Sequence, residues 1–203
     1  RRIAAPPPKV SLVLTDADRA AAGAWLAERR ITTPFVAVAP GSIWGTKRWP
    51  HYPALAAALP WPAVIVGSVD DADLADAIVA SAPGRAASAA GALSLRASAA
   101  LIHRAAILVT NDSAPLHLAT AVGTPIVGLF GPTVPEFGFG PRRRSDVVLG
   151  HEGLACRPCS RHGPQTCPLG HHRCMRELTV ETVAAAVTAA ASAEEPGAIC
   201  PRS

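Results

Sequence analysis

The sequence lacks the features that would place it among membrane, secreted or repeat proteins. None of its apolar runs reaches the ~18 to 20 residues that a membrane-spanning helix needs. It has no initiator methionine, and its first residues, RRIAAPPPK, lack the apolar core of a signal peptide. No internal repeat is present. We therefore expect a soluble, cytoplasmic chain whose first residues continue something upstream.

A large excess of one charge is also absent. The net charge of +4 suits an anionic ligand or an anionic membrane face without proving either. The one dense basic run, Arg142 to Arg144, fits a solvated loop at least as well as a binding patch. Hydrophobic residues make up 49% of the chain, which excludes a disordered composition. Many of them are alanines, so we expect an ordinary core between alanine-rich helices.

Helix and strand patterns alternate along most of the chain. Thr15 is a natural N-cap, and acids in the next turn favour a helix to about Arg30. Strands are expected at 35–39, 63–66, 107–109 and 125–130, and further helices at 50–59, 70–80, 94–106, 113–122 and 179–191. This alternation predicts an α/β, Rossmann-like fold, a parallel sheet with helices on both faces. Ligands of such folds bind at the carboxyl ends of the strands.

The first motif at a strand end is PGSIWGTKRWP, residues 40–50. Its glycines permit a close approach of the backbone to a ligand, Ser42 and Thr46 offer hydroxyls, and Lys47 and Arg48 offer positive charge. The motif suits a diphosphate, although it is not the P-loop pattern. Taken alone, a basic surface loop explains it equally well.

The second motif, TNDSAPLHLA at 110–119, follows an apolar strand and opens a helix. Free amides at a helix start bind anions, and Ser113 is a natural N-cap there. Asp112 at the strand end can reach sugar hydroxyls, and His117 lies one turn into the helix. Capping and surface positions explain each residue singly, but a binding site explains the combination better.

Two other strand ends carry weaker signals. Asp70 and Asp71 follow the strand at 63–66, where an acid can accept hydrogen bonds from ribose or simply cap the next helix. Thr133 follows the strand at 125–130 and is a candidate ligand contact.

Four cysteines gather in a proline-rich segment after Gly140, spaced C-x2-C-x7-C-x6-C: Cys156, Cys159, Cys167 and Cys174. This spacing predicts a tetrahedral thiolate site for zinc or iron, with His162, His171 and His172 as substitute ligands. Such a site would be structural, because four protein ligands leave no open position. Disulfides, which a reducing cytoplasm disfavours, and four free thiols are the alternatives.

Taken in order, these motifs resemble glycosyltransferase family 9, the heptosyltransferases of lipopolysaccharide core assembly. The matching stretches are APGSIWGTKRWP, VGSVDDADLA, GALSLRASAALIHRA, VTNDSAPLHLATAVGTPIVGLFGPT and CRPCSRHGPQTCPLGHHRCM. The likeness runs from about residue 33 to about residue 187. The family commonly has glycine where this chain has Ala114, and we expect the extra methyl group to be tolerated.

The resemblance implies the C-terminal half of a two-domain GT-B fold. Its parts would be a linker and interdomain helix (1–32), a Rossmann-like nucleotide-sugar-binding domain (33–140), a Cys/His-rich appendage (141–178) and a C-terminal helix and tail (179–203). The implied reaction is the inverting transfer of a heptose from ADP-heptose to the inner core of lipopolysaccharide. No cofactor is required, and the missing N-terminal domain holds the acceptor and the base. The isolated chain should therefore transfer nothing.

The resemblance also implies residue roles. Lys47, Asp112 and His117 would be catalytic: Lys47 and His117, with the amides of Ser113 and Ala114, stabilise the departing diphosphate, and Asp112 holds the sugar. The remaining donor contacts would be Ser42 and Thr46 at the diphosphate, Asp71 at the ribose and Leu93 at the adenine.

Other functions remain open from the sequence. They are a GT-B transferase with another donor, such as a UDP-sugar, a non-catalytic nucleotide-sugar sensor, and a zinc-ribbon protein that binds nucleic acid through Arg142 to Arg144. The last leaves the strand–helix alternation unexplained, so we expect no nucleic-acid partner. The expected location is the cytoplasmic face of the bacterial inner membrane, with peripheral contact to it.

Overall fold

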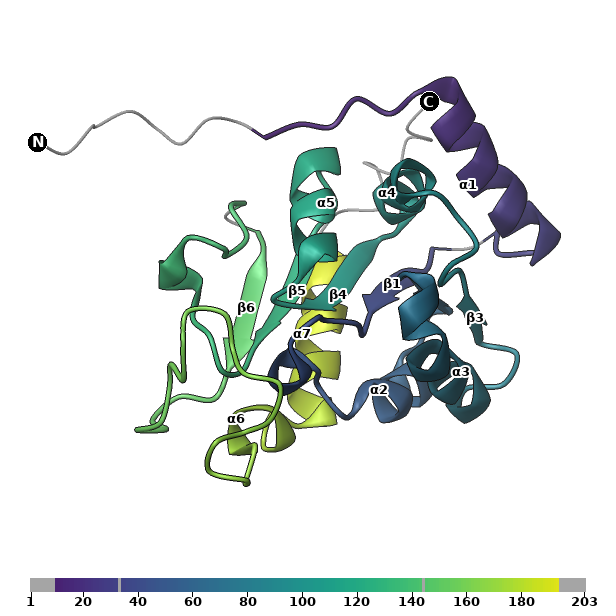
Figure 1. Cartoon of the computed structure of the whole chain (residues 1–203). Coiled ribbons are helices and arrows are strands. Elements are labelled where there is room, and N and C mark those ends of the chain that lie inside the picture. The colour runs from purple at the N-terminus through teal and green to yellow at the C-terminus, as the bar shows by residue number, and fades with distance from the viewer. Residues whose placement is uncertain (1–9, 33, 144, 194–203) are drawn as a thin grey trace, which may run out of the picture.

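The computed structural model describes residues 10–32, 34–143 and 145–193. Its centre is a six-stranded parallel sheet with the order β3-β2-β1-β4-β5-β6 (Figure 1). The strands are β1 (Val36–Ala39), β2 (Ala63–Ile65), β3 (Ala86–Ser88), β4 (Ile107–Asn111), β5 (Ile126–Phe130) and β6 (Val147–Gly150). This is the doubly wound order, in which the strand order reverses between β1 and β4. The predicted Rossmann-like fold is confirmed.

Helices cover both faces of the sheet. One face carries α1 (Asp16–Glu28), α4 (Leu95–Arg104) and α5 (Ala114–Val122), and the other carries α2 (Tyr52–Ala58), α3 (Ala72–Ser81) and α7 (Val180–Ala193). Val36 and Val38 of β1 pack into the core on the α2 side, whereas Ala37 and Ala39 pack on the α1 side. Because both faces are covered, the central strands read as continuous apolar runs.

Short helical turns lie in the loops between these strands and helices. They are η1 (Gly45–Lys47), η2 (Val69–Asp71), η3 (Pro135–Phe137) and α6 (Arg173–Arg176). The predicted cap of the first helix is confirmed as a capping box. Thr15 Oγ1 accepts a hydrogen bond from the Asp18 amide at 3.2 Å, and the Asp18 carboxylate accepts one from the Thr15 amide at 2.8 Å.

Two strands were not predicted. β3 consists of Ala-Ala-Ser, so it carries none of the β-branched or aromatic residues that signal a strand. β6 lies inside residues 141–178 and pairs with β5. The predicted appendage is therefore not confirmed as a separate part, because its segment contributes an edge strand to the central sheet. The boundaries proposed at residues 32, 140 and 178 stay predictions.

The helices on either side of the predicted domain also belong to the two cores. Trp25 and Leu26 of α1 are buried with α4, and Val183 and Val187 of α7 are buried under the sheet. The predicted linker at 1–9 and the tail from residue 194 lie outside the described residues. Among the described helices, none combines the length and the apolar character that crossing a membrane requires.

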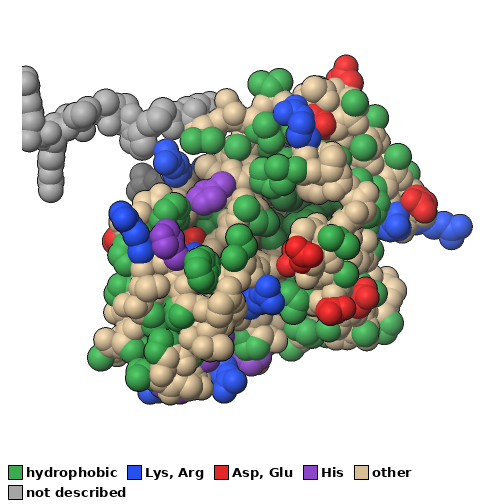
Figure 2. Space-filling view, viewed as in Figure 1, with side chains coloured by type: hydrophobic (Ala, Val, Ile, Leu, Met, Phe, Trp, Pro, Cys, Tyr) green, Lys and Arg blue, Asp and Glu red, His purple; other side chains and the backbone are tan. Residues whose placement is uncertain are grey.

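Charge is unevenly spread over the face drawn in Figure 2. Histidine side chains (purple) lie beside basic ones (blue) toward the left, whereas most of the visible acidic side chains (red) lie toward the right. The left part corresponds to the side of β6 in Figure 1. On this face, an anionic ligand would therefore meet fewer carboxylates on the β6 side.

Candidate functional site

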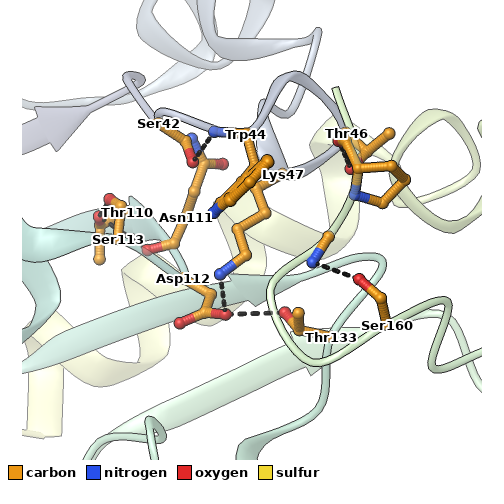
Figure 3. A network of polar contacts seen from close by, with 12 residues as sticks. Ser42, Trp44, Thr46, Lys47, Thr110, Asn111, Asp112, Ser113, Thr133 and Ser160 are labelled. Atoms are coloured by element: carbon orange, nitrogen blue, oxygen red, sulfur yellow. Dashed lines mark hydrogen bonds and ion pairs between the residues drawn. The ribbon is translucent and has the colours of Figure 1, made fainter. Parts of the chain in front are cut away.

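Three loops meet at the carboxyl ends of β1, β4 and β5. Lys47 lies in η1 after β1, Asp112 follows β4 directly, and Thr133 follows β5. The Lys47 ammonium nitrogen is 2.6 Å from Asp112 Oδ2, and the Thr133 hydroxyl donates a hydrogen bond to the same oxygen at 2.7 Å (Figure 3). This network lies at the point where the strand order reverses, which is where doubly wound folds bind their ligands. The structure thus brings together Lys47 and Asp112, two of the residues that the sequence analysis assigned to the donor site.

The network is almost completely removed from solvent. The Lys47 side chain is 9% exposed and that of Asp112 is 5% exposed. A buried charge destabilises the folded state strongly unless an opposite charge is paired with it. Lys47 and Asp112 therefore each offset the cost of burying the other. In Figure 3 the second carboxylate oxygen of Asp112 points away from Lys47 and Thr133. The loops thus hold one cation and one anion in a fixed arrangement at the mouth of the sheet.

Asn111 anchors this arrangement, a role that the sequence reasoning did not assign. Its side-chain amide donates to the Pro40 carbonyl at 2.8 Å. Its oxygen accepts from the Trp49 amide at 3.2 Å and from the Tyr52 hydroxyl at 3.1 Å. Burial raises the pKa of Tyr52 well above its usual value, so its hydroxyl remains a neutral donor. One buried side chain therefore ties the end of β4 to both ends of the Lys47 loop. The signal in the sequence was an asparagine that closes an otherwise apolar strand.

The start of α5 lies next to Asp112. Ser113 occupies the N-cap position, as predicted, but makes no side-chain hydrogen bond to the helix amides. Its hydroxyl lies 3.4 Å from the Thr110 hydroxyl instead. The first amides of α5 are therefore not satisfied by the cap, which leaves them suited to an anion. Ala114 is exposed at this start.

His117 lies apart from the buried pair. Its side chain is exposed on α5, and its ring centroid is 6.4 Å from that of Phe139. Phe139 in turn lies near His162, and His162 stacks with Trp44 at a centroid distance of 6.5 Å. The described contacts thus place the His117 ring in an aromatic row and not against Lys47 or Asp112.

The predicted diphosphate hydroxyls have partners within the protein. Ser42 Oγ accepts a hydrogen bond from the Trp44 amide at 3.2 Å. Thr46 is buried, and its hydroxyl donates to the Pro164 carbonyl at 2.5 Å. The Thr46 hydroxyl is thus used to hold the loop itself. Direct contact of either residue with a ligand stays a prediction.

Asp71 serves as a cap and also lies at the site. Its carboxylate accepts from the amide and the hydroxyl of Ser68, at 2.9 and 3.1 Å, in a capping box. A methyl group at Gly41 or Gly67 would collide with this carboxylate. Because both residues are glycines, the Asp71 carboxylate can lie close to the ends of β1 and β2. Leu93 is half-buried against the core on the α1 side. The ribose and adenine roles of Asp71 and Leu93 stay predictions.

The four cysteines are not assembled into the predicted metal site. No group of three or more histidines, cysteines or acids among the described residues is placed so that it could hold a metal ion. The described cysteines are free thiols, of which Cys174 is buried and the others are half-buried. Burial raises the pKa of the Cys174 thiol to about 11. The pKa of Cys159 is also raised, mainly by burial and to a smaller extent by the nearby Cys156. As the structure places them, these residues do not fit zinc or iron.

A family model supports the resemblance. The model of glycosyltransferase family 9 (heptosyltransferase) matches residues 3–169. A lipooligosaccharide heptosyltransferase 2 of Campylobacter jejuni is 41% identical over 78 residues, which is 38% of this chain and 23% of that protein. The lipooligosaccharide heptosyltransferase 2 of Haemophilus influenzae is 29% identical over 160 residues, which is 73% of this chain and 44% of that protein. The chain thus spans less than half the length of these relatives.

Solved structures show the same fold. E. coli ADP-heptose LPS heptosyltransferase II aligns with a TM-score of 0.75 at 24% identity, over 94% of this chain and 56% of its own. A family 9 glycosyltransferase from Veillonella parvula aligns with a TM-score of 0.76 at 23% identity, over 90% of this chain and 54% of its own. TibC, an iron-containing dodecameric glycosyltransferase from enterotoxigenic E. coli, aligns at 0.60 with 17% identity, over 79% of this chain and 47% of its own.

Proposed function

The chain belongs to glycosyltransferase family 9, and we propose that it is the donor-binding half of a heptosyltransferase that uses ADP-heptose. The inner core of lipopolysaccharide is the acceptor in this proposal. The relatives named heptosyltransferase 2 and the alignment with E. coli ADP-heptose LPS heptosyltransferase II support this assignment. Because the chain spans about half of that structure, the activity belongs to a longer protein.

The buried Lys47–Asp112–Thr133 network carries the proposal. Transfer of the sugar breaks its bond to the diphosphate, so ADP departs with additional negative charge. A fixed cation and preorganised amides stabilise such a charge better than water does, because they need not reorient. Lys47 provides the cation, and the amides of Ser113 and Ala114 at the start of α5 provide donors beside it. His117, one turn further along α5, would reach the outer side of the diphosphate.

Asp112 has a second task in this proposal. One carboxylate oxygen is taken by Lys47 and Thr133, and the other can accept a hydrogen bond from a heptose hydroxyl. Asp71 beside the Gly41 turn would accept from the ribose, and Leu93 would lie against the adenine. Ser42 would contact the diphosphate, whereas Thr46 would act through the loop that its hydroxyl holds.

The base that deprotonates the acceptor is assigned to an N-terminal domain outside this chain. The proposed location of the whole enzyme is the cytoplasmic face of the inner membrane, in peripheral contact with it. No metal enters the proposed chemistry. A structural zinc or iron ion at the four cysteines is a separate prediction from their spacing. Metal analysis tests it: one equivalent per chain that is lost in a Cys156→Ser variant would support it, and a metal-free wild type would refute it.

Calorimetry and a transfer assay test the proposed function. The chain should bind ADP-heptose and ADP, and UDP- and GDP-sugars should bind at least about tenfold more weakly. Tighter binding of a UDP-sugar would assign the chain to another donor. With ADP-heptose and a lipopolysaccharide acceptor, the chain alone should form no product. Turnover by this chain would contradict the assignment of the base to the missing domain.

A further inference from the structure

The cysteine-rich segment crosses the candidate site. We call residues 157–172 the strap. At one end of the strap, the Pro164 carbonyl accepts hydrogen bonds from the amide and the hydroxyl of Thr46, at 3.2 and 2.5 Å. Gln165 accepts from the Gly45 amide at 3.1 Å and donates to the Ile43 carbonyl at 2.9 Å. Pro164 and Gln165 therefore hold Ile43, Gly45 and Thr46, which precede Lys47 in its loop.

His172 adds another bond on the same side. Its Nε2 donates to the Thr46 carbonyl at 2.7 Å, and its own amide donates to Cys167 Sγ at 3.4 Å. A shallow cavity of about 230 Å³ lies between strap and loop and is lined in part by Thr46, Gln165, Cys167 and His172. The strap and the Lys47 loop are thus joined by hydrogen bonds and leave a small cavity between them.

The other end of the strap holds the loop after β5. The Arg157 guanidinium donates to the carbonyls of Phe130 and Thr133, at 3.0 and 3.1 Å, and also to that of His151. The Cys159 amide donates to the Pro132 carbonyl at 2.8 Å. The planar fork of an arginine suits such a set of neighbouring carbonyls.

Two glycines let the strap lie flush on these loops. A methyl group at Gly45 would collide with the Gln165 carbonyl. Gly163 has a φ of +81°, and a methyl group there would lie 3.1 Å from Pro132 and 3.2 Å from the Thr46 hydroxyl. Gly163 therefore sits between the loop after β1 and the loop after β5, where its positive φ favours glycine and a side chain would be tight against both loops.

We propose that the strap positions the donor site. Lys47 and Thr133 both bind Asp112 Oδ2, and each is carried by a loop that the strap holds. Asp112 itself needs no such support, because it follows a buried strand. Gln165 and His172 set the place of Lys47, and Arg157 sets that of Thr133. They are positioning residues, and their role in donor binding rests on the proposed function.

Variants of the strap test this proposal. The double variant Gln165→Ala/His172→Asn removes both side-chain grips on the Lys47 loop. Asparagine is chosen because the backbone of His172 is left-handed, with a φ of 47°, which asparagine tolerates. Thr166→Ala, an exposed neighbour in the strap, is the matched control. Arg157→Lys keeps the charge and removes the planar fork that reaches the carbonyls of Phe130, Thr133 and His151.

Amide hydrogen exchange of the unliganded chain is the first measurement. In the double variant, residues 43–47 should exchange at least about tenfold faster, while β1, β4 and β5 keep their protection. In Arg157→Lys the increase should appear at residues 130–133. Thr166→Ala should match the wild type. Unchanged exchange at 43–47 in the double variant would overturn the proposal.

Binding of ADP-heptose by calorimetry is the second measurement. The double variant should bind about tenfold more weakly than the wild type, with core protection unchanged. Faster exchange with unchanged affinity would overturn the positioning role and leave the proposed function intact. A wild type that does not bind ADP-heptose would instead contradict the proposed function. Amide hydrogen exchange at residues 43–47 would then decide by itself whether the strap orders the loops.

Discussion

The two sides of the candidate site are held in place by different means. Asn111 and Asp112 end a strand that is buried on both faces, so backbone pairing and the two cores fix them. Lys47 and Thr133 lie in loops. Asn111 holds the two ends of the Lys47 loop, and hydrogen bonds with the strap hold its middle and the Thr133 loop. The anion of the pair is thus placed by the end of a buried strand, whereas its cation lies in the part of a loop that the strap holds.

The largest effect should come from removing the residue that both sides share. Asp112→Ala leaves the Lys47 ammonium buried without its partner, so we expect a loss of ~3–5 kcal/mol of unfolding free energy. Urea unfolding measures this loss. Asp70→Ala, which removes an exposed acid, should change the free energy by less than about 0.5 kcal/mol. Equal effects of the two substitutions would mean that the Lys47–Asp112 pair is not buried as described.

Asn111→Ala tests the anchoring by the strand end, which includes its bonds to both ends of the Lys47 loop. The change leaves the Tyr52 hydroxyl, the Trp49 amide and the Pro40 carbonyl without their partner in the interior. We expect a loss of roughly 2–3 kcal/mol in urea unfolding, because buried polar groups without a partner are costly. A loss below that of a typical surface substitution would show that Asn111 does not anchor the loop.

Gln165→Ala tests the loop-built side alone. Its partners Gly45 and Ile43 lie near solvent, where water can replace the lost bonds. The unfolding free energy should therefore fall by less than about 1 kcal/mol. If this variant destabilised the chain as much as Asn111→Ala, the two sides would not differ as proposed.

Thiol labelling separates the three half-buried cysteines, Cys156, Cys159 and Cys167, from Cys174, which packs in the core. A pKa of about 11 for Cys174 leaves roughly one thiol in a thousand ionised at pH 8. Since only the thiolate reacts, alkylation of Cys174 should be slowest and should accelerate about tenfold per pH unit until the pH nears that pKa. Mass spectrometry after iodoacetamide treatment checks this order. Labelling of Cys174 as fast as Cys156 or Cys167 would contradict its burial.

The fold was predictable where burial left a clear pattern. The continuous apolar runs of β1, β4 and β5 and the N-cap residues before α1 and α5 identified these elements correctly. β3 was missed because Ala-Ala-Ser carries no strand preference, and β6 because it lies in a segment rich in proline and cysteine. Apolar periodicity reports what faces a core, and these edge strands face one only in part.

The site was predictable in the same uneven way. Lys47 and Asp112 could be placed together because both follow parallel strands that end at one edge of the sheet. The bond from Thr133 to Asp112 was not predicted, because it depends on the path of a loop. The strap was not predicted at all: Gly45 and Gln165 lie 120 positions apart, and most of its bonds use backbone atoms that every residue has.

The four cysteines show what a spacing along the chain leaves open. Their C-x-x-C pattern predicted a metal site, but the structure uses the neighbouring residues as grips: Arg157 on the Thr133 loop and His172 on the Lys47 loop. Spacing records how far apart residues are along the chain. It does not record which of them turn toward a common centre.

The binding of ADP-heptose to the wild type and to Lys47→Ala tests the central claim most directly. Calorimetry should find the Lys47→Ala variant about 100-fold weaker, because in the proposed function this change removes the cation that binds the diphosphate. His117→Ala should show a smaller loss, since that side chain is exposed. Unchanged affinity in both Lys47→Ala and His117→Ala would contradict the donor site.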